Sequence, residues 1–174
     1  MCILPNNIEY IEPEDLFNIV NIIRGFEYIY KEEVPNYDDQ KESIDDYFAL
    51  IDRSKTIYYP TILDKASYLF ININSHYFSN GNKRLSAIST VYFLKKNNYV
   101  PSNLLKKNYK DILNSLFTDC KFKDWEGFEP KDFGLYNLAI IVAKKNEDKD
   151  NRISDDELKE KVKSFFEQTF LQNN

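Results

Sequence analysis

Apolar residues recur every three or four positions along most of this chain, the spacing of one face of an α-helix. In the stretch 13–30, for example, Leu16, Ile19 and Ile23 fall on one face behind a proline-led, acidic first turn. Glycine, the residue that most readily opens turns, occurs only 4 times in 174 residues. The pattern therefore predicts a protein built from helices.

Six other segments show the same spacing or carry a helix start signal. In the C-terminal segment, 154–170, Ser154 followed by Glu157 predicts a capping box. One short segment, 54–59, is instead rich in strand formers and is interpreted as an extended hairpin or flap. We expect a single all-α domain over 1–174 with one short β flap. The further predicted helices are 43–51, 60–75, 83–96, 104–117, 132–144 and 154–170.

Composition narrows the classes of function. Hydrophobic residues make up 43% of the chain, which fits a packed core, and the net charge of −5 gives no general attraction to nucleic acid. The lysine pairs 95–96, 106–107 and 144–145 are separated and are interpreted as solvated. Two cysteines provide neither a disulfide framework nor a zinc spacing. With no apolar stretch of membrane-spanning length and no signal-like start, we expect a cytoplasmic protein without a membrane partner.

Residues 76–84 read His-Tyr-Phe-Ser-Asn-Gly-Asn-Lys-Arg, and His76 is the only histidine of the chain. Gly81 and Asn82 are residue types that tolerate a left-handed backbone, so they predict a tight turn. A helix that starts directly after a turn leaves backbone N–H groups pointing at one spot, where its dipole favours an anion. Lys83 and Arg84 add two cations there. The segment predicts a phosphate cradle with an imidazole close by.

This run resembles the signature of the Fic/Doc family, His-x-Phe-x-(Asp/Glu)-(Gly/Ala)-Asn-(Gly/Lys)-Arg. The resemblance implies a Fic-like helical bundle with a flap before the motif helices. Many adenylylating members carry glycine where this chain has Lys83, and they usually carry a second arginine where it has Ala87. Both differences resemble the death-on-curing (Doc) toxins. The residues that fall in register are His76, Phe78, Gly81, Asn82, Lys83 and Arg84.

The resemblance implies transfer of a phosphate-containing group from ATP or another nucleotide to a Ser, Thr or Tyr hydroxyl of a target protein. His76 would be the general base, and Lys83 and Arg84 would stabilise the transferred phosphate. The backbone around Gly81 and Asn82, together with the Asn82 side chain, would hold the phosphates. We expect Doc-like phosphorylation by the toxin of a toxin–antitoxin pair. The alternative is AMP transfer by a Fic enzyme.

Asn80 stands where the family has the acidic residue that binds Mg²⁺ on the nucleotide. An amide oxygen can ligate Mg²⁺ but brings no negative charge, so we expect weaker metal binding and weaker activity. A catalytically impaired binding module with the Fic fold is therefore a third possibility.

In Fic enzymes the flap pairs with the backbone of the target as an added strand. Carried over to this chain, that role falls on Lys55, Thr56 and Ile57, although six residues between helices are also an ordinary connector. The self-inhibitory pattern Ser/Thr-x-x-x-Glu-Gly/Asn is absent from the sequence. We therefore expect any inhibitor to act in trans, as a small antitoxin.

The segment 146–157 is a near match to a calcium-binding EF-hand loop, with Asp148, Asp150, Ser154 and Glu157 at ligand-type positions. The invariant glycine is replaced by Asn151, and no second copy is present. The preferred interpretation is an acidic, solvated connection between helices, with calcium binding left as the alternative.

Overall fold

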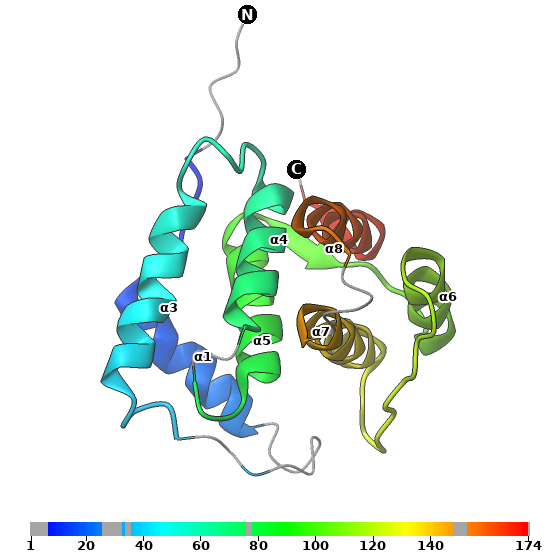
Figure 1. Ribbon diagram of the computed structural model, residues 1–174, viewed down its shortest axis with the longest axis horizontal. Coiled ribbons are helices and arrows are strands. Elements are labelled where there is room, and N and C mark those ends of the chain that lie inside the picture. Colours follow the sequence, from blue (N-terminus) through cyan, green and yellow to red (C-terminus); the bar gives the residue numbers. More distant parts are fainter. Residues whose placement is uncertain (1–6, 26–32, 34–35, 76–77, 148–152, 174) are drawn as a thin grey trace, which may run out of the picture.

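The computed structural model describes residues 7–25, 33, 36–75, 78–147 and 153–173. These residues form seven helices and one two-stranded sheet, which confirms the all-α fold with a short β element (Figure 1). None of the described helices is both long and apolar enough to cross a membrane. The elements in chain order are α1 Pro13–Gly25, α3 Lys41–Ser54, α4 Ile62–Ile73, α5 Asn82–Lys96, β1 Tyr99–Pro101, α6 Lys106–Leu116, α7 Pro130–Glu147, α8 Asp155–Thr169 and β2 Phe170–Gln172.

Helix α5 lies at the centre of this assembly, in contact with α1, α4 and α7. Residues 84–91 are all buried, so the helix is enclosed on nearly every side rather than along the one apolar face that its periodicity predicts. Its small polar residues find partners inside: Ser86 Oγ donates to the carbonyl of Phe70 at 2.6 Å, and Ser89 Oγ lies 2.9 Å from the Tyr47 hydroxyl. Buried hydroxyls paired in this way cost little stability.

Helix α4 begins with a complete capping box. Thr61 Oγ1 accepts from the N–H of Asp64 at 3.1 Å, and Asp64 Oδ2 accepts from the N–H of Thr61 at 3.1 Å. At the start of α8, Ser154 Oγ accepts from the N–H of Glu157 at 3.1 Å, which is one of the two bonds of the predicted capping box. These caps fix where α4 and α8 begin.

The small sheet joins the chain after α5 to the end of α8. β1 and β2 are antiparallel, with Tyr99 opposite Gln172 and Pro101 opposite Phe170. Two further backbone bonds of 2.8 Å extend the pairing, from Ser102 N to Thr169 O and from Asn173 N to Asn98 O. The β element therefore lies after the motif helices.

The flap predicted at 54–59 is not extended. Ser54 ends α3, and the following residues form turns closed by the N–H groups of Lys55 and Thr56 bonding to carbonyls three residues back. The buried ammonium of Lys65 donates to the carbonyl of Ser54 at 2.8 Å and to that of Thr56 at 3.3 Å. Much of the backbone of this segment is bonded within turns or to Lys65, and no strand among the described residues pairs with it. A strand-forming composition alone therefore does not make a strand here.

Candidate functional site

The motif enters α5 through a tight turn at Gly81. Gly81 is the N-cap of α5 with φ 77° and ψ 10°, a left-handed conformation that glycine adopts without steric cost. Its carbonyl accepts from the N–H of Leu85 at 2.9 Å, which closes the first helical turn. The predicted turn is confirmed, and α5 starts at Asn82, one residue earlier than predicted.

The side chain of Asn82 holds the turn together from inside. Its Oδ1 accepts from the N–H of Phe78 at 2.9 Å, and its Nδ2 donates to the carbonyl of Phe78 at 2.7 Å. Asn82 is buried, and so is the ring of Phe78. Because both bonds of this amide go to the backbone of Phe78, its observed contribution is to fix the shape of the loop before α5.

Tyr37, a buried residue outside the motif, supports the same turn. Its hydroxyl donates to the carbonyl of Gly81 at 2.9 Å, and its ring packs edge-on against Phe78 with 5.1 Å between the centroids. Burial raises the pKa of the Tyr37 hydroxyl far above its ordinary value of 10.0, although the nearby charge of Arg84 opposes the shift. Tyr37 therefore stays protonated and remains a hydrogen-bond donor at all physiological pH values.

Gln40 holds the loop at Ser79, the residue after Phe78. Its Oε1 accepts from the N–H of Ser79 at 2.8 Å. Tyr37 and Gln40 reach the motif across sequence separations of 44 and 39 positions. Sequence analysis missed both, since no local pattern reveals contacts over such distances.

A cavity of about 530 Å³ opens at the start of α5. Its walls are residues 79–84 of the motif together with Glu33, Lys123, Tyr136 and Ile140. We call it the α5 cavity. Of the predicted site residues, it brings together Asn80, Gly81, Asn82, Lys83 and Arg84.

Positive charge predominates in the α5 cavity. Among the described residues that line it, Lys83, Arg84 and Lys123 are cationic and Glu33 is the one acid. Arg84 is only 1% exposed, and its Nη2 donates to the backbone carbonyl of Glu33 at 2.7 Å. The first turn of α5, which is described throughout, contains no acidic residue and has no side-chain cap. The positive end of the helix dipole therefore adds to the three cations, and the cavity suits a phosphate group.

Asn80 does not complete a magnesium site here. Its Oδ1 accepts from the N–H of Gly81 at 2.7 Å, so the amide oxygen serves the turn. The described part of the chain contains no group of three or more His, Cys, Asp or Glu side chains suited to a metal. Since Mg²⁺ prefers oxygen ligands with negative charge, these donors do not fit a resident ion.

His76, the predicted general base, lies outside the described residues, as does Tyr77. The chain is held on both sides of them. Asn74 is fully buried and donates from Nδ2 to the carbonyl of Ala139 at 2.7 Å, and Phe78 is buried against Tyr37.

A second cavity, of about 770 Å³, continues from the first along α7 and shares Lys123 and Ile140 with it. We call it the lysine cavity. Lys121, Lys144 and Lys145 also line it, over a floor of isoleucines and Phe122. The pair Lys144–Lys145, which sequence analysis interpreted as merely solvated, thus borders a hollow. The other pairs differ: Lys96 binds Asp15 at 2.7 Å, and Lys106 binds Asp124 at 2.7 Å.

The predicted target-binding residues lie away from the α5 cavity. They precede α4, whereas the motif follows it, and the 12 residues of α4 span about 18 Å. Lys55 pairs with Asp52 at 2.8 Å, Thr56 Oγ1 donates to the carbonyl of Arg53, and Ile57 is 90% exposed. The structure does not bring this segment to the α5 cavity.

Most of the EF-hand-like segment, 148–152, lies outside the described residues. At its end Ser154 caps α8, which accords with the preferred interpretation of a helix connection. Calcium binding stays an alternative.

Comparison of the chain with protein-family models, curated proteins and solved structures finds no match. The resemblance to Fic/Doc proteins therefore rests on the motif residues alone.

Proposed function

We propose that this chain is a nucleotide-dependent transferase of the Fic/Doc kind, which moves a phosphate-containing group onto a hydroxyl side chain of a target protein. The α5 cavity carries the proposal. There Lys83 and Arg84 of the motif meet Lys123 beside the N–H groups of a helix start, in a protein whose net charge is −5. Such a concentration of positive charge at one helix start favours the phosphates of a nucleotide.

The lysine cavity supports a nucleotide rather than a free phosphate. It adjoins the α5 cavity through Lys123 and Ile140 and offers an apolar floor with the ring of Phe122. In the proposal the phosphates lie at the start of α5 and the nucleoside lies along α7, with Lys144 and Lys145 beside it. A base can stack on an aromatic ring without sequence-specific contacts.

In the proposed reaction, the hydroxyl oxygen of the target bonds to the γ-phosphorus of ATP, the bond from that phosphorus to the bridging oxygen breaks, and ADP leaves. His76 accepts the hydroxyl proton as general base, as the family resemblance implies. Lys83 and Arg84 balance the charge on the transferred group.

Lys83 favours phosphate transfer over AMP transfer. It lines the α5 cavity as an extra cation at the position where many adenylylating relatives carry glycine. AMP transfer by the same loop is the alternative. A third candidate, a binding module without efficient chemistry, is favoured by Asn80, whose side chain bonds its own turn and adds no carboxylate.

The proposal also covers how the activity of the protein is regulated. The sequence lacks the pattern by which some Fic proteins restrain themselves. We propose a cytoplasmic toxin that is held inactive by a small antitoxin.

Radiolabelled ATP separates the three candidates. The purified protein is incubated with cell extract and MgCl₂, with the label at either the α- or the γ-phosphate. We expect protein labelling from γ-labelled ATP alone. Labelling from α-labelled ATP would instead establish AMP transfer. ATP binding without either label, in the wild type and in Asn80→Asp, would indicate a binding module.

Matched variants test the mechanism. His76→Ala and Arg84→Ala should abolish labelling, whereas Lys107→Ala, an exposed lysine on α6, should leave it unchanged. Robust labelling by His76→Ala would contradict the proposed role of the imidazole.

A further inference from the structure

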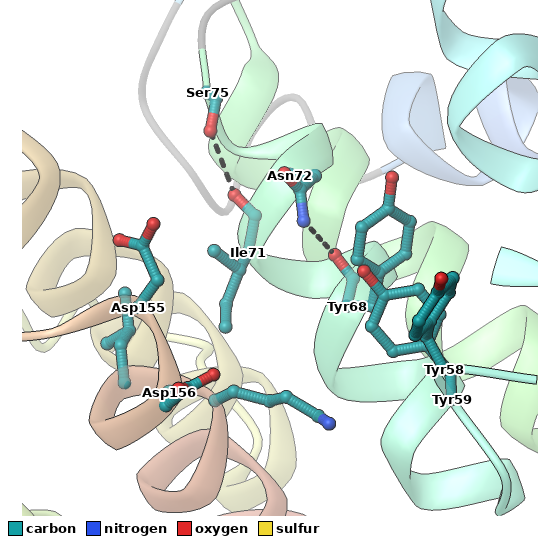
Figure 2. Close-up of a pocket in the computed structure, with 10 residues that line it drawn as sticks. Tyr58, Tyr59, Tyr68, Ile71, Asn72, Ser75, Asp155 and Asp156 are labelled. Atoms are coloured by element: carbon teal, nitrogen blue, oxygen red, sulfur yellow. Dashed lines mark hydrogen bonds between the residues drawn. The ribbon is translucent and has the colours of Figure 1, made fainter. Parts of the chain in front are cut away.

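A third cavity, of about 620 Å³, lies between α4 and the start of α8, with Tyr58 and Tyr59 of the turn between α3 and α4 at one side (Figure 2). One face of α4 forms its wall, through Tyr68, Ile71 and Asn72, and Ser75 in the turn after the helix continues it. We call it the tyrosine cavity. It is separate from the α5 and lysine cavities and shares no lining residue with them.

The turn side of this cavity is aromatic. The rings of Tyr59 and Tyr68 lie 4.3 Å apart between centroids, and Tyr58 beside them is 79% exposed. The ammonium of Lys159 lies 5.3 Å from the centre of the Tyr59 ring. A cation therefore already lies over one tyrosine face, and the exposed ring of Tyr58 offers another to a cation from outside.

The opposite side is acidic. Asp155 and Asp156, in the first turn of α8, lie across the cavity from Tyr58 and Tyr59 (Figure 2). Lys159 lies 3.8 Å from the buried carboxylate of Asp64, but Lys163 lies closer to that carboxylate at 3.0 Å. Among the described residues, the lining of the cavity therefore holds two aspartates and one cation. Asp156 forms no ion pair in the described part of the chain. Tyrosine faces opposite carboxylates make up the surroundings that a guanidinium group prefers.

The position of the tyrosine cavity relates it to the motif. Ser75 lines it and Ser79 lines the α5 cavity, so residues four positions apart in the sequence border the two cavities. Their charges are opposite: one is rich in lysine and arginine, the other in tyrosine and aspartate. A phosphate donor and a cationic partner would thus be directed to two different cavities, bordered by residues close together in the sequence.

We propose that the tyrosine cavity binds an arginine side chain of the protein segment that presents the acceptor hydroxyl. The proposal rests on the proposed function and adds to it the chemistry of the target: an arginine close in sequence to the modified residue. The guanidinium lies against the tyrosine rings and bonds the carboxylates of Asp155 and Asp156. This docking needs no added strand, which accords with the turn found where the flap was predicted.

Two peptides test the inference directly: acetyl-Gly-Ser-Arg-Ser-Gly-amide and its counterpart with neutral citrulline in place of arginine. Binding is followed by NMR of protein labelled with ¹³C on its tyrosine rings, without ATP. We expect the arginine peptide to move the signals of Tyr58, Tyr59 and Tyr68 and to bind about fivefold more tightly than the citrulline peptide. Equal binding, or unmoved tyrosine signals, would overturn the proposal.

Variants that each remove one carboxylate from the cavity provide a second test. Asp155→Asn and Asp156→Asn should each weaken binding of the arginine peptide about threefold to fivefold. Glu14→Gln, an exposed first-turn acid of α1, should have no effect and controls for the loss of a helix-start charge. Two other results would also overturn the proposal: tyrosine signals that move with ATP, or a dimer that Tyr59→Ala dissociates, since either identifies a different occupant.

Label transfer from γ-labelled ATP, measured on the same variants, distinguishes this inference from the proposed function. Transfer without arginine-selective binding would refute the docking site alone. Arginine-selective binding without any transfer would refute the proposed function, and with it the acceptor role of the site.

Discussion

The hydroxyl of Tyr37 donates a 2.9 Å hydrogen bond to the carbonyl of Gly81, 44 positions away in the sequence. The bond joins the segment before α3 to the turn that starts α5. The same tyrosine packs its ring against Phe78, so one side chain supports the motif loop at two points. The shape of the α5 cavity therefore depends on a residue outside the motif.

Tyr37→Phe should lower the free energy of unfolding by about 1 kcal/mol, because the ring contact is kept and one buried hydrogen bond is lost. Urea unfolding measures this change. ATP affinity, measured by calorimetry, should fall as the loop loosens. Tyr58→Phe, at an exposed tyrosine, serves as the control. Unchanged stability and affinity in Tyr37→Phe would refute the supporting role.

Gly81→Ala should destabilise the protein by about 1 to 2 kcal/mol, since alanine is strained at the left-handed φ of 77°. Gly25→Ala is the matched control, because a Cβ at Gly25 meets nothing within 4 Å. Thermal unfolding of the two variants should separate them clearly. A Gly81→Ala protein as stable as the control would mean that the turn adopts another conformation.

Asn82→Ala should cost about 1 to 3 kcal/mol, because it leaves the buried N–H and carbonyl of Phe78 without their partner. Asn80→Ala, at an exposed position of the same loop, should change stability much less. Chemical unfolding curves measure both. If the two variants lose equal stability, the inner bonds of Asn82 do not hold the turn.

Asp64 should make stability depend on pH. Burial raises its pKa, but hydrogen bonds from Thr61 and Lys163 more than offset this, and the pKa lies below its ordinary value of 3.8. The stabilisation is therefore complete above that value and is lost as the pH falls through the lower pKa of the folded state. Asp64→Asn should unfold with about 2 kcal/mol less free energy at pH 7, and the gap should narrow below pH 3.8. Unfolding curves across pH test this, with the exposed Asp46→Asn as a control that should parallel the wild type.

Lys123 lines both the α5 cavity and the lysine cavity, so Lys123→Ala should weaken ATP binding by about tenfold. Added KCl should weaken the wild type more than the variant, because one screened charge contact is already gone. Calorimetric titrations at two salt concentrations measure both effects. Lys107→Ala, an exposed lysine on α6, should bind ATP like the wild type; an equal loss there would point to non-specific attraction.

Local sequence patterns were sufficient to predict most of the helices. Helical spacing of apolar residues predicts α3, α6 and α8 to within a few residues, because each buries one face. The same rule finds α5 but misjudges its surroundings, since Ser86 and Ser89 are buried through hydrogen bonds that periodicity does not register. The sheet was missed because strands of three residues carry almost no pattern, and their pairing joins distant segments.

The candidate site also contains residues that local sequence patterns predict and residues that they do not. The turn at Gly81 and the cations that follow it were predictable, because glycine and charge act locally. Lys123 and Tyr136 reach the cavity only through the packing of the helical assembly, which no spacing in the sequence encodes. The strand-forming residues before α4 misled the prediction, because Lys65 and local turn bonds outweigh their preference.

Helix α5 is attached at both of its ends: the loop bonds of Tyr37 and Gln40 hold its start, and the pairing of β1 with β2 ties the segment after it to α8. A helix held this way has little freedom to slide along its axis. The backbone amides of α5 should therefore exchange with solvent among the slowest in the molecule, and their exchange should change little when a nucleotide binds. Accommodation of a ligand then falls to the side chains of Lys83 and Lys123.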